Sequence, residues 1–376
     1  MYMNIILILT YKTSLKIWSQ AGLLQREMLF YKNLSELHNI NFTFITFGDE
    51  SDQEYKDYFK NLKIIPIYSL IKKSNYGFVN LLKSLYFPFL VKKNLNNIDI
   101  IKTNQLAGSW IGIILKFLLR KPLIVRTGFD KVLFLKKDKK PKIFVFLAYL
   151  LTQMSILFGD IYLVTSQQDY NYIKKNYFGT SKKLEIRPNW VVRQKRTDLD
   201  GRFDNRILLV GRLEKQKNYP IIIKSFSGSE YTLDIVGSGS ELEKLKILSR
   251  ENNVKVNFLG NLENDKLIKL YSQYLFFIIG SRFEGNSKVI LEAMSAGCVV
   301  LVSNIPNNKE IIEDKEDGYL FELGSSLPEL ISFLKSEKNN LETVSINATN
   351  KIKNVYSLSS MVSKELATYE KFLNID

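Results

Sequence analysis

Residues 275–297 read LFFIIGSRFEGNSKVILEAMSAG, and this stretch decides the fold. The apolar run Leu275–Gly280 ends in a glycine, which is typical of a buried strand. A polar turn follows, and Ser287–Ala296 then has helical spacing, with a serine suited to the N-cap. The next apolar run, Val299–Ser303, predicts another strand. A strand, a helix and a strand in this order predict a parallel βαβ unit.

The same alternation surrounds this unit in the second half of the chain. Further strands are predicted at Arg206–Gly211, Thr232–Gly237 and Val254–Leu259, and further helices at Glu241–Glu251, Asn264–Ser272 and Asn308–Glu313. Short apolar runs separated by helices are typical of a doubly wound sheet. We therefore predict a Rossmann-like domain over residues 203–355.

The first half repeats the pattern, and 376 residues exceed what one core commonly holds. Strands are predicted at Ile5–Leu9, Phe42–Thr46, Ile98–Thr103, Leu123–Arg126 and Ile161–Thr165, and helices at Gln25–Leu37 and Val79–Leu95. The polar stretch 193–205 has no hydrophobic rhythm and predicts a linker. The expected fold class is α/β, with two doubly wound Rossmann-like domains that face a central cleft. The first covers residues 1–192, and a last helix at 356–374 is expected to pack back on it.

The excess of positive over negative residues is confined to the first half of the chain. The net charge is +15, and residues 1–200 carry 31 Lys and Arg against 15 Asp and Glu, whereas residues 201–376 carry 22 against 23. A basic half predicts an anionic partner, such as nucleic acid, phospholipid headgroups or a phosphorylated substrate. Nucleic acid is disfavoured because the sequence has neither a basic recognition helix nor an aromatic stacking platform.

The rare residues narrow the chemistry further. Cys298 and His38 are the only cysteine and the only histidine, which excludes an internal disulfide and a Cys- or His-rich metal site. Cys298 lies in an apolar run and is expected to be a buried thiol, and His38 a surface or packing residue. The apolar start predicts a first strand rather than a signal peptide. Ile143–Phe158 is too short to span a bilayer and predicts a buried or membrane-lying helix.

The turn before Ser287 predicts an anion site. The first amides of a helix that starts there would point into the cleft with the positive end of the helix dipole. Glu284 precedes this helix and Glu292 lies within it, about 12 Å further along if the spacing is helical. The two carboxylates therefore bracket an extended ligand that also contacts the amides of Gly285, Asn286 and Ser287. The alternative is that Glu284 is only a turn residue and Glu292 only a solvated helix residue, so that the two share no ligand.

Two other strand exits carry candidate binding residues. Gly211 permits close backbone approach after its strand, and Arg212 and Lys217 are placed to reach a diphosphate. The alternative for this stretch is a solvated basic turn. Gly237 belongs to a glycine-rich turn that is not a full dinucleotide fingerprint. Leu259, at the end of another strand, offers its main chain to a base.

These motifs together resemble the family 4 retaining glycosyltransferases, which have the GT-B fold. The resemblance rests on Gly211-Arg212-Leu213 with Lys217-Asn218, on Val236-Gly237-Ser238-Gly239, on Phe258-Leu259-Gly260 and on Glu284 and Glu292 eight residues apart. It covers nearly all of residues 206–325, is looser over the first 200 residues, and includes Ile186-Arg187-Pro188-Asn189-Trp190.

The resemblance implies roles for these residues. Arg212 and Lys217 would bind the donor diphosphate, Glu292 the ribose hydroxyls, and Glu284 the donor sugar, so that Glu284, Arg212 and Lys217 form the catalytic set. Gly22 sits where the family has a glycine loop near the phosphates, although this chain has one glycine there instead of two. Many relatives have a histidine after the fourth strand of the first domain. Here Arg126 and Thr127 occupy that region and are the acceptor-side candidates.

The implied reaction moves a sugar from a nucleoside-diphosphate sugar to an acceptor, with retention at the anomeric carbon. The departing diphosphate needs cations and oriented amides more than a strong base. We expect no metal, because no Asp-x-Asp pair follows a strand, and no other cofactor. The alternatives are a GT-B enzyme that is not a transferase, such as a sugar-nucleotide epimerase, a donor-binding subunit without activity, and a nucleic-acid-binding protein.

The basic first half is expected to bind the acceptor. Lysines between Lys136 and Lys142 precede the apolar run from Ile143, and together they predict contact with an anionic membrane surface. The alternative is that surface lysines only reflect a biased composition. We therefore expect a lipid-linked or polysaccharide acceptor in O-antigen, capsule or lipopolysaccharide synthesis, and a cytoplasmic protein bound peripherally to the inner face of the membrane.

Overall fold

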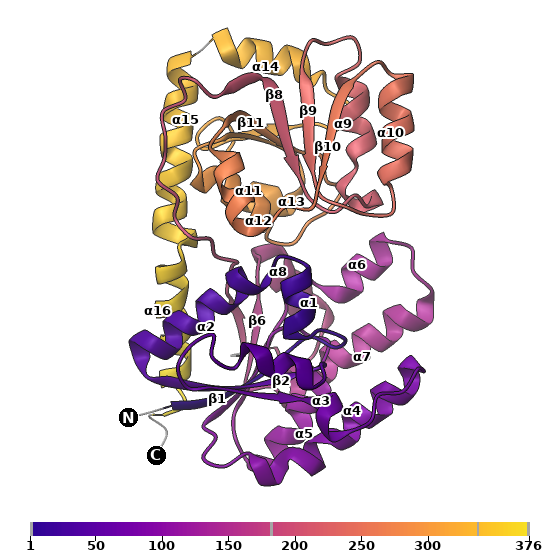
Figure 1. Ribbon diagram of the computed structural model, residues 1–376, viewed down its shortest axis with the longest axis vertical. Helices are drawn as coiled ribbons and strands as arrows, with labels where there is room; N and C mark the ends of the chain where they lie inside the picture. The colour runs from indigo at the N-terminus through magenta and orange to yellow at the C-terminus, as the bar shows by residue number, and fades with distance from the viewer. Residues whose placement is uncertain (1–2, 181–182, 337, 374–376) are drawn as a thin grey trace. The chain divides into compact units, whose positions relative to one another are not determined.

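The computed structural model describes residues 3–180, 183–336 and 338–373 (Figure 1). The chain forms two compact units, which are described separately below. The first unit comprises Met1–Arg187 and Val362–Asp376, and the second comprises Pro188–Met361. The division falls before residue 192 because the chain after Pro188 is bound within the second unit, where Val191 N donates to Tyr356 O at 3.0 Å.

The first unit is built on a seven-stranded parallel sheet with the order β3-β2-β1-β4-β5-β6-β7. Its strands are β1 (Met3–Ile8), β2 (Ile40–Thr46), β3 (Leu62–Pro66), β4 (Ile100–Thr103), β5 (Leu123–Arg126), β6 (Ile161–Val164) and β7 (Leu184–Ile186). Strand order reverses between β1 and β4, and the loops after these strands are joined by a hydrogen bond from Tyr11 N to Ala107 O at 2.8 Å.

Helices cover this sheet. They are α1 (Leu15–Gln20), α2 (Leu24–His38), α3 (Ile67–Leu70), α4 (Gly77–Val91), α5 (Ser109–Leu119), α6 (Lys131–Lys137), α7 (Lys142–Phe158) and α8 (Gln167–Asn176), with 3-10 turns η1 (Glu50–Tyr55) and η2 (Lys92–Asn94). Residues of α4, α5, α7 and α8 share one core with the strands. His38 ends α2 and is partly exposed.

The last helix, α16 (Leu358–Glu370), brings a buried carboxylate to the first sheet. Glu365 pairs with Lys102 of β4, and each side chain is only 1–2 % exposed. Arg187 approaches the same carboxylate at 3.6 Å and donates to the Thr368 hydroxyl at 2.7 Å. Removal of one partner from such a pair is costly, because a buried charge is then left uncompensated.

The second unit is a three-layer α/β/α structure on a six-stranded parallel sheet with the order β10-β9-β8-β11-β12-β13. Its strands are β8 (Phe203–Val210), β9 (Thr232–Val236), β10 (Lys255–Gly260), β11 (Tyr274–Ile279), β12 (Val299–Ser303) and β13 (Tyr319–Phe321). Alternate strand residues enter opposite cores: Ile207 and Leu209 pack on one face, and Leu208 and Val210 on the other.

The helices of the second unit are α9 (Tyr219–Ser225), α10 (Leu242–Glu251), α11 (Asn264–Tyr271), α12 (Lys288–Ser295), α13 (Pro306–Ile311), α14 (Leu327–Ser336) and α15 (Lys338–Lys351), with η3 (Lys215–Lys217) and η4 (Ile352–Tyr356). Side chains of α9, α10, α14 and α15 pack in one core, and those of α12 and α13 in the other. The expected α/β class with two Rossmann-like sheets is confirmed.

The sequence predicts a buried or a membrane-lying helix at 143–158. The buried alternative is wrong, because α7 turns its large apolar side chains outward, and the membrane-lying alternative stays a prediction. Its buried residues are Thr152, Ser155 and Ile156. Seven large apolar residues, Ile143, Phe144, Phe146, Leu147, Leu150, Met154 and Leu157, are 37–59 % exposed. Among the described residues, no helix has the length and apolar character that crossing a bilayer requires.

Candidate functional site

The loops after β8 and β11 meet at the point where the strand order of the second sheet reverses. β8 pairs with β9 on one side and with β11 on the other, so the two loops leave neighbouring strands at their carboxyl ends. A hydrogen bond from Arg282 N to Gln216 O at 3.0 Å joins them. Open α/β sheets bind ligands at such a reversal.

Two glycines let the β8 and β9 exits approach each other. Gly237 has φ 139°, and a Cβ there would lie 2.0 Å from the carbonyl oxygen of Gly211. At Gly211 itself a Cβ would lie 3.3 Å from Cε of Lys217 and 3.1 Å from the Tyr219 hydroxyl. The missing side chain of Gly237 therefore leaves room for the Gly211 carbonyl, and that of Gly211 leaves room for the stem of Lys217 and the Tyr219 hydroxyl.

Lys217 and Glu284 form an ion pair between the two loops. The ammonium of Lys217 lies 2.5 Å from Oε1 of Glu284, and the two side chains are 12 % and 7 % exposed. Gln216 donates from Nε2 to Phe283 O at 2.8 Å and, at 3.5 Å, to Oε2 of Glu284. The hydroxyl of Ser281 also donates to Glu284. These contacts fix the carboxylate in one orientation at the end of β11.

Arg212 is exposed beside this cluster. It makes one long hydrogen bond, 3.5 Å from Nη2 to Oε1 of Gln216. Its guanidinium thus keeps most of its donors available, and a fork of donors suits bidentate contact with a phosphate.

The helix α12 begins as the sequence predicted, with Ser287 at the N-cap position. The Ser287 side chain makes no capping hydrogen bond, so the first amides of α12 have no partner from this hydroxyl. The turn before the helix is held by Asn189, whose N–H donates to Oδ1 of Asn286 at 2.9 Å and whose side-chain amide donates to the Asn286 carbonyl. Gly285 is partly exposed between Glu284 and this anchored asparagine.

Glu292 lies within α12 and is 7 % exposed. The buried hydroxyl of Tyr271 donates to its Oε2 at 3.2 Å. The carboxylate is therefore oriented from α11, and it is not the solvated helix residue of the alternative interpretation.

Leu259 and Gly260 end β10 beside the β9 exit. Leu259 is 38 % exposed, and the Gly260 carbonyl accepts from Gly237 N at 2.8 Å. The backbone of this exit is thus tied to the glycine turn.

The remaining predicted residues lie in the first unit. Gly22 has φ 68° and lies between α1 and α2, not in the loop directly after β1. Arg126 ends β5, and its N–H donates to the Thr103 hydroxyl at 3.2 Å. Thr127 is 3 % exposed, and its hydroxyl donates to Phe129 O at 2.6 Å. This hydroxyl is committed to a turn, which makes Thr127 the weaker of the two acceptor-side candidates.

Burial sets the protonation of two neighbours. Burial, and then the charge of Glu284, raises the pKa of Tyr219, so its hydroxyl stays neutral and donates to Gly211 O at 3.0 Å. Burial raises the pKa of Cys298 to about 12, which leaves an unreactive thiol as the sequence suggested. Within the described part of the chain, no three His, Cys, Asp or Glu residues are grouped to hold a metal ion.

Four residues of the site were missed from the sequence. Gln216, Ser281, Tyr271 and Asn189 each orient a predicted residue, but none had been given a role. The sequence signals are a motif for Asn189, which lies in the stretch Ile186–Trp190 that resembles the family, and position for Gln216 and Ser281, which lie beside Lys217 and Glu284.

The chain is similar to several known glycosyltransferases. Residues 196–351 match the family described as glycosyl transferases group 1. An N-acetylgalactosaminyltransferase of Campylobacter jejuni that acts on N-acetylgalactosamine-N,N'-diacetylbacillosaminyl-diphospho-undecaprenol is 30% identical over 174 residues, which are 44% of this chain and 47% of that protein. A protein from the cps region of Klebsiella pneumoniae is 25% identical over 264 residues, 64% of this chain and 70% of the relative.

The chain spans about half the length of the first of these relatives. Among solved structures, sucrose-phosphate synthase from Thermosynechococcus elongatus superposes with a TM-score of 0.80 at 16% identity, over 100% of both chains. The Anabaena protein HepE, in complex with UDP and glucose, gives 0.75 at 16% identity, over 98% of this chain and 100% of HepE. The chain therefore has the fold of the GT-B glycosyltransferases. Its residues 196–351 are similar to the group 1 glycosyl transferases.

Proposed function

We propose that this protein is a retaining glycosyltransferase that moves a sugar from a nucleoside-diphosphate sugar to a lipid-linked or polysaccharide acceptor in cell-surface glycan synthesis. The observation that carries this proposal is the Lys217–Glu284 pair at the reversal point of the second sheet. In this proposal Lys217 is the cation for a phosphate and Glu284 the carboxylate for a sugar hydroxyl. Both lie inside the stretch that matches the group 1 family.

The donor is proposed to lie along this edge of the sheet. Lys217 and exposed Arg212 neutralise the diphosphate as charge develops on it, and the first amides of α12 add fixed donors. Glu292, oriented by Tyr271, accepts from the ribose hydroxyls. The main chain near Leu259 faces the base, and Glu284 holds the donor sugar.

These residues supply the positive charge that a departing diphosphate needs, and we propose that no metal takes part. Activity that is unchanged by excess EDTA supports this, and activity that returns only with a divalent cation contradicts it. Retention is proposed from the family resemblance. The anomeric configuration of the product, read by proton NMR, decides it.

A thermal-shift panel of UDP-, GDP- and ADP-sugars tests the donor assignment. A ligand that binds only the folded chain raises the melting temperature by mass action. We expect one nucleotide class to raise it in the wild-type protein and the same class to release nucleoside diphosphate when acceptor lipids are added. No shift with any of these donors contradicts the proposed function.

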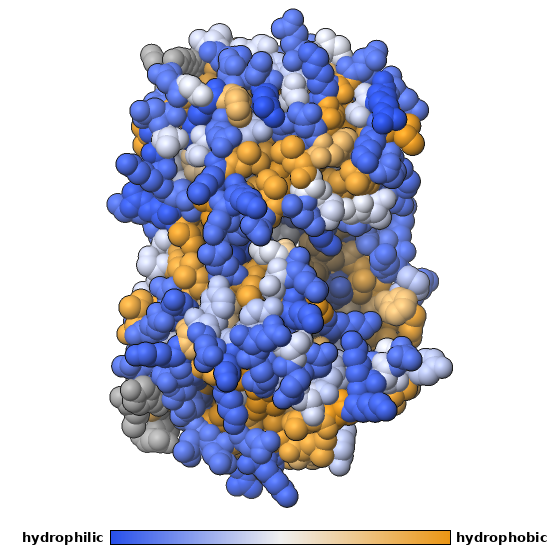
Figure 2. All heavy atoms as spheres, viewed as in Figure 1, coloured by the Kyte–Doolittle hydropathy of each residue, from blue (hydrophilic) through white to orange (hydrophobic). Residues whose placement is uncertain are grey.

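The first unit is proposed to lie on an anionic membrane. α5 packs between α4 and α7, and all three helices expose apolar side chains. In Figure 2, hydrophobic atoms gather over the region where Figure 1 places α4 and α5. We define the apolar face by its most exposed aromatic residues on these helices, which are 54–70 % exposed: Phe78, Tyr86, Phe89, Phe117, Phe144 and Phe146.

Polar contacts join these helices on their inward sides. Ser84 of α4 accepts from Trp110 Nε1 at 2.9 Å, and Ser109 and Ser155 hydrogen-bond at 2.8 Å between α5 and α7. In α7, where Thr152 and Ser155 are buried and Phe144 and Phe146 are exposed, the pattern of a water-facing helix is inverted. Lysines from Lys131 to Lys142 adjoin the apolar face and match the charge of an anionic bilayer.

Vesicle sedimentation tests this surface. The protein is expected to sediment with phosphatidylglycerol vesicles, less with phosphatidylcholine, and less at high salt. Phe144→Ser with Phe146→Ser should release it, whereas Phe333→Ser, at a residue of α14 that is also 59 % exposed, should not. Wild-type protein that stays in solution with both lipids contradicts membrane binding.

A further inference from the structure

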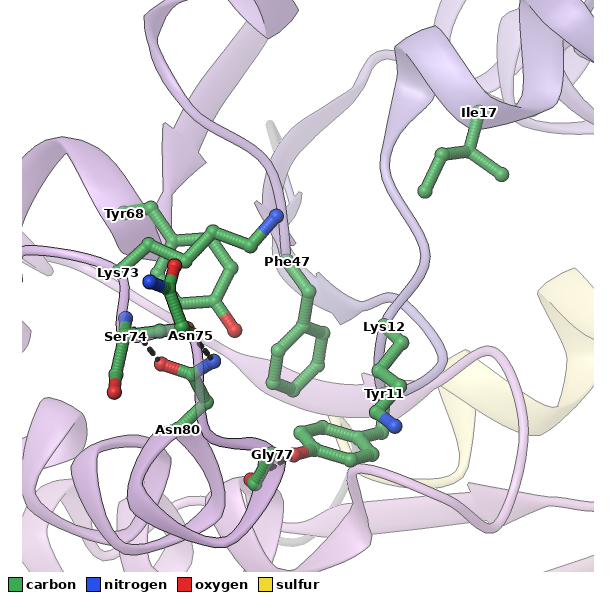
Figure 3. Close-up of a pocket in the computed structure, with 10 residues that line it drawn as sticks. All are labelled: Tyr11, Lys12, Ile17, Phe47, Tyr68, Lys73, Ser74, Asn75, Gly77 and Asn80. Carbon is green, nitrogen blue, oxygen red and sulfur yellow. Dashed lines mark hydrogen bonds between the residues drawn. The ribbon is translucent and has the colours of Figure 1, made fainter.

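A cavity of about 600 Å³ lies in the first unit, beyond the carboxyl ends of β1, β2 and β3 (Figure 3). Three aromatic rings line it: Tyr11 follows β1, Phe47 follows β2, and Tyr68 belongs to α3. Two lysines, Lys12 and Lys73, line it together with the uncharged polar residues Ser74, Asn75 and Asn80. None of these residues has a role in the donor site described above.

The two lysines present cations without internal carboxylate partners. Among the described residues, neither makes a salt bridge; Lys12 Nζ lies 5.6 Å from the Tyr11 ring centre and Lys73 Nζ 5.4 Å from that of Tyr68. Asp49 is influenced by Lys73, but its carboxylate accepts from the Ser51 hydroxyl at 2.7 Å. Figure 3 shows the two amines on opposite sides of the Phe47 ring.

The backbone around Lys12 is strained for a side chain. Its φ is 64°, in the left-handed region that non-glycine residues seldom adopt. The turn is held by hydrogen bonds from Tyr11 N to Ala107 O and from Thr13 N to Thr10 O, both at 2.8 Å. This turn brings Lys12 to the wall of the cavity.

Other contacts fix the walls of the cavity. Asn80 clamps the loop that carries Lys73, since Ser74 N donates to its Oδ1 at 2.8 Å and its Nδ2 donates to Ser74 O at 2.7 Å. The Tyr11 hydroxyl donates to Gly77 O at 3.0 Å, and the Tyr11 ring lies edge-on to Phe47 at 5.1 Å. A site with fixed walls loses less entropy when a ligand binds.

We propose that this cavity binds the phosphate-bearing end of the acceptor, a diphosphate ester carried on a lipid. The inference rests on the proposed function and adds the group that is recognised. Lysines bind phosphates as point charges, and aromatic rings bind apolar chains and the faces of sugar rings. The cavity reaches Gly77 and Asn80 in the first turn of α4, the helix whose later residues Tyr86 and Phe89 belong to the apolar face. A lipid tail that leaves the cavity along α4 thus remains in contact with apolar side chains.

Binding of farnesyl diphosphate to the full chain, measured by calorimetry, tests the proposal. The variant Lys12→Gln/Lys73→Gln is expected to raise the dissociation constant at least about tenfold, the loss of two charge-assisted contacts. The control Lys56→Gln/Lys60→Gln removes the same charge from exposed positions outside the cavity and should leave it within about twofold. Farnesol should bind weakly to all three proteins.

Two further measurements complete the test. One distinguishes an acceptor diphosphate from bilayer headgroups as the anion that the lysines bind, and the other distinguishes failure of this proposal from failure of the proposed function. Sedimentation with phosphatidylglycerol vesicles should be the same for Lys12→Gln/Lys73→Gln and wild type; an equal loss of vesicle binding would assign the lysines to bilayer headgroups and overturn the proposal. An unchanged dissociation constant for farnesyl diphosphate, or no binding by the wild type, also overturns it. The shift caused by the donor sugar nucleotide should persist in the variant, and its absence in the wild type refutes the proposed function instead.

Discussion

The ammonium of Lys217 lies 2.5 Å from the carboxylate of Glu284, and this contact joins the loop after β8 to the loop after β11. The strands are neighbours in the sheet although 67 residues separate the two side chains. Since both side chains are largely buried, the pair holds each partner extended toward the edge of the sheet. In the proposed reaction this cation needs no reorganisation to meet the leaving diphosphate.

Lys217→Ala is predicted to lower kcat/KM by a factor of about 100 to 1000, because one fixed charge at the developing oxyanion is lost. The measurement is release of nucleoside diphosphate from the donor that the panel identifies. Lys215→Ala removes an exposed lysine of the same turn η3 and should change the rate less than about twofold. Equal losses in the two variants would show that only the net charge of the turn matters.

Glu292→Gln is predicted to abolish most of the thermal shift caused by the donor, because a ribose hydroxyl loses its charged acceptor. Glu243→Gln alters a carboxylate of α10 whose side chain is 77 % exposed, and should leave the shift intact. An unchanged thermal shift in Glu292→Gln would show that the ribose hydroxyls do not bind to this residue.

Gly237→Ala is predicted to destabilise the second unit and to impair donor binding together. The new Cβ would lie 2.0 Å from the Gly211 carbonyl oxygen, so the β8 exit beside Lys217 must shift. The unfavourable φ of 139° adds to the cost, for a total of roughly 2 kcal/mol or more. Denaturant unfolding measures this loss. Gly228→Ala, where a Cβ meets open space at φ 72°, serves as the control for strain without a clash.

Asp130 should make the protein less stable as pH rises from about 4 to about 6. Burial, assisted by the charge of Asp169, raises its pKa from 3.8 to about 6 although the carboxylate caps α6. Between these pH values the folded chain holds a proton that the unfolded chain has released, so stability falls with rising pH. Asp130→Asn keeps a capping oxygen and should gain about 2 kcal/mol at pH 7 and nothing at pH 4. Unfolding curves with parallel pH dependence would contradict the assignment.

Most strands could be predicted because long apolar runs mark the interiors of both sheets. Leu123–Arg126 and Val299–Ser303 are found with the predicted bounds. β3, β7 and β13 were missed, and each is an edge strand, where partial exposure shortens the apolar run.

The site was predicted only in parts. Arg212, Lys217, Glu284 and Glu292 follow from local motifs, but their orientation depends on which strands are neighbours. Sheet order brings Gln216 to Glu284, and the packing of α11 on α12 brings Tyr271 to Glu292. The cavity at Lys12 and Lys73 gave no local signal, because its lining comes from loops after three different strands.

The most direct test of the central claim is a crystal structure of the protein with the nucleoside diphosphate that the panel selects. The account predicts the phosphates within hydrogen-bond distance of Lys217, Arg212 or the first amides of α12, with the ribose hydroxyls on Glu292. A nucleotide bound away from the exits of β8 and β11, with Lys217 and Glu292 untouched, would contradict it.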